Sequence, residues 1–119
     1  MMKKLKTLDA ACAVVALCYA SKQDEEAVLR VATMHGFKAG EGMTDSQWIP
    51  AAKVLGLNMR ALSFEHMELR KFIKQYPIGL YFVSTPQHLF VLDNGLIIDP
   101  RTDGQKLRRS VRQAWKIYT

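Results

Sequence analysis

The chain has 119 residues, of which 49% are hydrophobic and 24% are charged, and its formal net charge at pH 7 is +6. This length and composition predict one globular domain, residues 1–119, and argue against a disordered chain. No stretch approaches the roughly 18 consecutive apolar residues of a membrane-spanning helix, so we expect no membrane span.

Two helices are predicted in the first third of the chain. Asp9 is a favourable N-cap for a helix over residues 10–20. Ser21, with the acidic residues that follow it, opens a second helix, and Gly36 closes it. In the first helix, one face carries Cys12, Val15, Ala16 and Tyr19.

A third helix is predicted from the capping box that Thr44 forms with Gln47. It extends through Leu55 and closes at Gly56. Pro50 falls inside this segment and has no backbone N–H to donate, so we expect a kink or a restart there.

The second half of the chain predicts a short helix and then mainly strands. Apolar residues at helical spacing behind a Ser63 cap indicate the helix, which Pro77 ends. The predicted strands span residues 57–62, 78–84, 87–93, 96–99 and 114–119. This order predicts an α+β domain with N-terminal helices packed on a C-terminal antiparallel sheet.

The two cysteines, Cys12 and Cys18, lie on one predicted helix. Six residues of helix separate them by about 9 Å and turn them to different faces, which is beyond disulfide geometry. Unpaired thiols are typical of a reducing compartment, so we expect a cytoplasmic protein. The start MMKKLK followed by AACAVVALCYA imitates a secretion signal, but Asp9 interrupts it and we do not expect cleavage.

The positive charge is concentrated near the C-terminal end of the chain. Such a cluster is typical of a solvated basic face, and it can also attract nucleic acid. The nearby aromatic residues, Trp115 and Tyr118, do not interleave with the bases as a stacking platform would, so nucleic acid is the less favoured partner. The bases are Arg101, Lys106, Arg108, Arg109, Arg112 and Lys116.

The stretch HLFVLDNGLIID predicts a hairpin around Asn94 and Gly95. In a two-residue turn, Asp99 lies opposite Phe90, and the period of two places His88 on the same face. His88 and Asp99 are then diagonal neighbours with Cα atoms about 7–8 Å apart. A carboxylate so placed can hydrogen-bond an imidazole, fix its tautomer and stabilise its charged form.

Cys12 is the candidate nucleophile for this pair. It falls in the first turn of its predicted helix, where free N–H groups and the helix dipole favour the thiolate. A thiolate beside an imidazolium is an activated pair for acyl transfer. Neither His35 nor His66 has metal-ligand spacing with the cysteines, so we expect no metal and no cofactor.

Four segments resemble the papain-like cysteine peptidases, most closely the bacteriocin-leader-processing (double-glycine) type and its short relatives in bacteria and phages. They are ACAVVALCYASKQDEEAVLRVA, EGMTDSQWIPAAKVLGL, FIKQYPIGLYFVS and QHLFVLDNGLIIDP. The resemblance implies a papain-like fold with a Cys12–His88–Asp99 triad, in which Cys12 lies on the central helix and His88 on the sheet across a cleft.

The sequence departs from that family around the nucleophile. Lys6 stands where the family has a Gln that donates to the oxyanion, and Ala-Cys-Ala replaces an Asp-Cys-Gly motif. Removal of such a donor typically costs about 10²–10³ in rate. The Cys12 backbone N–H and Lys6 are the candidate replacements, and Trp48 and Gln87 are the candidate substrate-side groups.

Three functions follow from these patterns. The first is a hydrolase, a thiol protease that cleaves a peptide or isopeptide bond in a peptide or protein substrate. The second is a catalytically weak or inactive scaffold of the same fold that binds another protein, for example a host protein if the source is a phage. The third is nucleic-acid binding through the basic cluster. The sequence predicts no oligomeric state.

Overall fold

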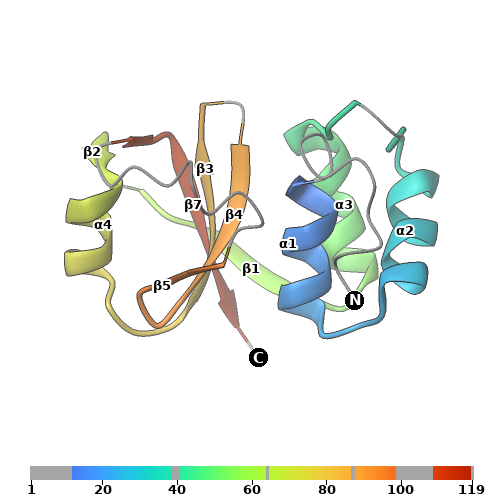
Figure 1. Cartoon of the computed structure of the whole chain (residues 1–119), viewed down its shortest axis with the longest axis horizontal. Helices are drawn as coiled ribbons and strands as arrows, with labels where there is room; N and C mark the ends of the chain where they lie inside the picture. The colour runs from blue at the N-terminus through green and yellow to red at the C-terminus, as the bar shows by residue number, and fades with distance from the viewer. Residues whose placement is uncertain (1–11, 39–40, 64, 87, 99–108, 119) are drawn as a thin grey trace.

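A five-stranded antiparallel sheet lies at the centre of the molecule, between two layers of other elements (Figure 1). The computed structural model describes residues 12–38, 41–63, 65–86, 88–98 and 109–118. The helices are α1 (Cys12–Ser21), α2 (Glu25–Met34), α3 (Asp45–Val54) and α4 (Leu69–Gln75). The strands are β1 (Asn58–Ala61), β2 (Met67–Glu68), β3 (Leu80–Thr85), β4 (His88–Asp93), β5 (Leu96–Ile98), β6 (Ser110–Val111) and β7 (Gln113–Tyr118). The predicted α+β class is confirmed.

The strand order of the main sheet is β1-β7-β3-β4-β5, and the short strands β2 and β6 pair separately. Helices α1 and α3 pack on one face of the sheet and α2 packs on their outer side, whereas α4 and the β2–β6 pair lie on the other face (Figure 1). Alternate residues of each central strand therefore point into different cores, as the two-residue period requires. Phe82 and Val91 face the three helices, and Val83 and Phe90 face α4.

Helix α1 is buried on nearly all sides. Every residue from Ala13 to Cys18 is buried, because α1 packs on β4 and is itself covered by α2 and α3. The face that carries Cys12 and Tyr19 is therefore not the only buried face of α1. Tyr19 itself is 37% exposed, and its hydroxyl donates a 2.6 Å hydrogen bond to Asp93 at the end of β4.

The predicted start of α3 is confirmed, since Thr44 and Gln47 form its capping box. The second helix is present, but Ser21 does not open it: Ser21 is the last residue of α1, and Asp24 caps α2 by accepting a hydrogen bond from the backbone of Ala27. The restart expected at Pro50 does not occur, since α3 runs through it to Val54. The prediction of a Ser63 cap was also wrong: α4 begins at Leu69, because the residues before it pair with β6 instead.

The hairpin register worked out from Asn94 and Gly95 is confirmed. Asp93 pairs with Leu96, and both turn residues have positive φ angles, 49° and 83°, as a two-residue turn of this kind requires. Strand β5 ends at Ile98, so Asp99 lies outside the described residues. None of the helices in the described ranges is long and apolar enough to cross a membrane.

Candidate active site

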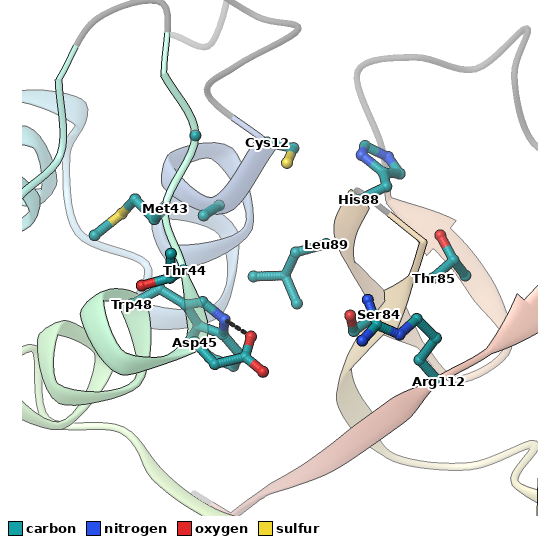
Figure 2. Close-up of a pocket in the computed structure, with 12 residues that line it drawn as sticks. Cys12, Met43, Thr44, Asp45, Trp48, Ser84, Thr85, His88, Leu89 and Arg112 are labelled. Carbon is teal, nitrogen blue, oxygen red and sulfur yellow. Dashed lines mark hydrogen bonds between the residues drawn. The ribbon is translucent and has the colours of Figure 1, made fainter.

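A pocket of about 670 Å³ opens between the helical layer and one end of the sheet (Figure 2). Three structural segments line it: the start of α1, the residues that lead into α3, and the ends of β3 and β4 that meet at the β3–β4 connection. Arg112, between β6 and β7, completes the wall on the sheet side. The pocket therefore joins residues that are far apart in sequence.

Cys12 lies at the mouth of this pocket. It is the first described residue of α1 and is half-buried, and its sulfur is directed toward the sheet (Figure 2). The backbone N–H groups of a helix's first turn have no acceptor within the helix, and their partial positive charge stabilises an anion. That the thiolate form of Cys12 is favoured here stays a prediction.

His88 faces Cys12 from the other side of the pocket mouth (Figure 2). It is the first residue of β4 and is 6% exposed, with its ring centroid 5.7 Å from that of Phe90. Phe90 shares its side of the sheet with His88 but packs on α4. Because His88 stands at the very end of the strand, its ring borders the pocket rather than the α4 core.

Thr85 lies beside His88 as its cross-strand partner in the β3–β4 pair. Its side chain lines the same pocket and is 1% exposed. The Thr85 hydroxyl has no hydrogen-bond partner within the part of the chain that the structure describes. Buried polar groups without a partner are rare, so this hydroxyl is an unusual feature of the site.

Two opposite charges stand on the two walls of the pocket. Asp45, at the start of α3, accepts a 2.9 Å hydrogen bond from the indole N–H of Trp48. Arg112 extends from the sheet side, and its backbone N–H is bonded to the carbonyl of Ser84. The pocket therefore offers both a carboxylate and a guanidinium to a bound molecule.

Trp48, predicted as a substrate-side group, lines the pocket but is only 1% exposed. Its ring centroid is 4.9 Å from that of Phe82 and 4.8 Å from that of Trp115. Most of the indole is thus part of the core between α3 and the sheet, and it supports the pocket wall from behind.

Cys18 is not part of the pocket. It is 3% exposed within the α1 core, and burial raises the pKa of its thiol to about 11. Very little of this thiol is ionised near neutral pH, so Cys18 is a structural residue. The two cysteines therefore differ in environment as predicted.

Three predicted site residues, Lys6, Gln87 and Asp99, lie outside the described residues. The roles of Asp99 as the carboxylate that orients His88 and of Lys6 as an oxyanion donor therefore stay predictions. Half of the basic cluster also lies outside them, and of the rest Arg109 and Lys116 are half-buried. The Lys116 ammonium lies 5.6 Å from the Tyr118 ring centroid.

Sequence reasoning missed Thr85, Asp45 and Arg112 as members of this site. Thr85 had a usable signal: only two positions separate it from His88 in the sequence, and in a tight hairpin such residues lie directly opposite each other, as these two do. No local sequence pattern indicated Asp45 or Arg112, because they reach the pocket only through long-range packing.

Comparisons with protein-family models, with curated proteins and with solved structures gave no significant match. Within the described ranges, no three His, Cys, Asp or Glu residues are grouped so that they could hold a metal ion.

Proposed function

We propose that this protein is a cysteine hydrolase of the papain-like type that cleaves a peptide or isopeptide bond in a cytoplasmic protein substrate. The observation that carries the proposal is the placement of Cys12 and His88 across the mouth of one pocket, at a helix start and a strand start (Figure 2). A cysteine on a buried central helix and a histidine on the adjoining antiparallel sheet also support the papain-like assignment.

The mechanism follows from these two side chains. His88 takes the proton of the Cys12 thiol, and the thiolate attacks the carbonyl carbon to form a tetrahedral intermediate. His88 then protonates the leaving amine, and the thioester that remains is hydrolysed by a water that His88 deprotonates. The Cys12 backbone N–H donates a hydrogen bond to the oxyanion of the intermediate, and Asp99 is assigned the role of orienting the His88 ring.

A peptide-cleavage assay tests this function. We expect the intact chain to cut members of a proteome-derived peptide mixture, with new termini detected by mass spectrometry, because Cys12 and His88 supply both nucleophile and base. Cys12→Ala should abolish every cut, whereas the matched variant Cys18→Ala should retain them all, since Cys18 lies outside the pocket.

Cleavage that persists in Cys12→Ala would contradict the proposal, and so would an intact protein that cleaves no peptide.

The replacement of the family's Gln by Lys6 favours one second candidate, a protein-binding module on the same scaffold. Its expected signature is capture of a partner protein that is unchanged in Cys12→Ala.

A further inference from the structure

Two opposite charges face each other in the pocket, apart from Cys12 and His88. Figure 2 shows the Arg112 guanidinium on the sheet side and the Asp45 carboxylate on the α3 side, directed toward each other. Leu89 lies between these charges and the side chains of Cys12 and His88 (Figure 2). Within the described residues no ion pair joins the two charges, so both are available to a molecule in the pocket.

The Asp45 carboxylate already has partners in the protein. Its Oδ1 atom accepts the 2.9 Å hydrogen bond from the Trp48 indole. Asp45 is also the first residue of α3, where the partial positive charge of the helix start stabilises a carboxylate. The charge of Asp45 is therefore balanced in part before any ligand binds.

The Arg112 guanidinium differs in this respect. The backbone N–H of Arg112 donates to the carbonyl of Ser84, which fixes the base of the side chain beside the end of β3. Across the part of the chain that the structure describes, no hydrogen bond or ion pair engages the guanidinium itself. A planar guanidinium can bind a carboxylate through two parallel hydrogen bonds, and the Ser84 hydroxyl, which lines the same pocket, can add a third.

We propose that Arg112 is a substrate-binding residue that favours substrates with a carboxylate near the cleaved bond, supplied by an Asp or Glu side chain or by a free C-terminus. This inference rests on the proposed function, because it assigns a substrate class to the same pocket. The carboxylate binds on the sheet side, at Arg112 and Ser84, since Asp45 repels it from the α3 side. This binding involves no covalent step.

The expected selectivity is moderate. Arg112 is exposed, so water and salt screen its charge, whereas two parallel hydrogen bonds strengthen its hold on a carboxylate. We expect roughly a fivefold preference for acidic over neutral peptides, which should weaken as the salt concentration rises.

Charge reversal at Arg112 tests the inference in the peptide-cleavage assay. Peptides with a carboxylate near the cut should be enriched about fivefold by the unmodified protein. Arg112→Glu leaves two carboxylates in the pocket, so the enrichment should pass to basic residues. Lys71→Glu is the matched control: it changes the net charge equally on the exposed side of α4, outside the pocket, and should keep the acidic preference.

A second peptide mixture with amidated C-termini identifies the source of the carboxylate. A preference for Asp and Glu that survives amidation assigns it to a side chain. A preference for cuts close to the C-terminus that amidation removes assigns it to the terminal carboxylate. Both results support recognition of a carboxylate by Arg112 when Arg112→Glu abolishes the preference.

Two thiol reagents that differ in charge test Arg112 without any cleavage. Iodoacetate carries a carboxylate and iodoacetamide is neutral, but both alkylate the thiolate of Cys12. The ratio of their rates therefore does not depend on how much of the thiol is ionised. Arg112→Glu should lower the iodoacetate-to-iodoacetamide ratio by about threefold or more, because a carboxylate then repels the charged reagent, whereas Lys71→Glu should leave it nearly unchanged.

Equal rate ratios in Arg112→Glu and Lys71→Glu would overturn the inference, as would cleaved peptides with no acidic enrichment. The proposed function fails in a different way, since the unmodified protein then cleaves no peptide. In that case the rate ratio alone decides whether Arg112 draws a carboxylate into the pocket.

Discussion

Alkylation of Cys12 by iodoacetamide at about pH 6 should fall by about a hundredfold when His88 is replaced by alanine. An ordinary thiol with a pKa near 8.5 is less than about 1% ionised at that pH, whereas a thiol that gives its proton to a neighbouring imidazole is mostly ionised. His88 faces Cys12 across the pocket mouth (Figure 2), so its removal leaves only the helix start to favour the thiolate.

The second cysteine is the internal reference for this experiment. Cys18 is buried and the pKa of its thiol is raised to about 11, so it should react very slowly at about pH 6 in either protein. Mass spectrometry of the labelled peptides resolves the two sites. His35→Ala is a matched control, because His35 lies at the end of α2 and bonds the carbonyl of Val31. Equal Cys12 rates in the His88→Ala variant and the unmodified protein would contradict the thiolate–imidazolium pair.

Replacement of Trp48 by alanine should lower the free energy of unfolding by about 3–5 kcal/mol, a large fraction of the stability of a small domain. Trp48 is 1% exposed and its ring contacts those of Phe82 and Trp115. The alanine variant leaves a cavity where α3 meets the sheet and also removes the N–H that holds Asp45. Urea denaturation followed by circular dichroism measures the change.

The variant Trp48→Phe separates the contribution of aromatic packing from that of the hydrogen bond to Asp45. The phenyl ring keeps part of the aromatic packing but cannot donate to Asp45, so we expect a smaller loss of about 1–2 kcal/mol. A Trp48→Ala variant as stable as the unmodified protein would show that the indole does not join α3 to the sheet.

Local sequence signals predicted the elements whose geometry is set by neighbouring residues. The capping box of α3 follows from Thr44 and Gln47, which interact within one turn. The β4–β5 register follows from the turn at Asn94 and Gly95, which leaves only one way for the two strands to pair. Three predicted site residues line the pocket. Cys12 and His88 stand at element ends that such signals define, whereas Trp48 lies within α3.

The features that the sequence did not predict depend on packing between segments that are far apart in the chain. Met67 and Glu68 read as part of a helix, yet they pair with residues of β6, which follows much later in the chain. The all-round burial of α1 depends on α2, α3 and β4, which pack around it, so the spacing of its own apolar residues could not predict that burial. Arg112 reaches the pocket through a break between β6 and β7 that no local pattern marks.

The most direct test of the Cys12–His88 pair is the pKa of His88, followed by NMR of its ring protons in the unmodified protein and in Cys12→Ala. A thiolate next to the ring stabilises the imidazolium, so the pKa of His88 should lie above its ordinary value of about 6.5 and should fall by at least about one unit in the variant. A pKa of His88 that is the same in both proteins would contradict the proposed pairing of thiolate and imidazolium.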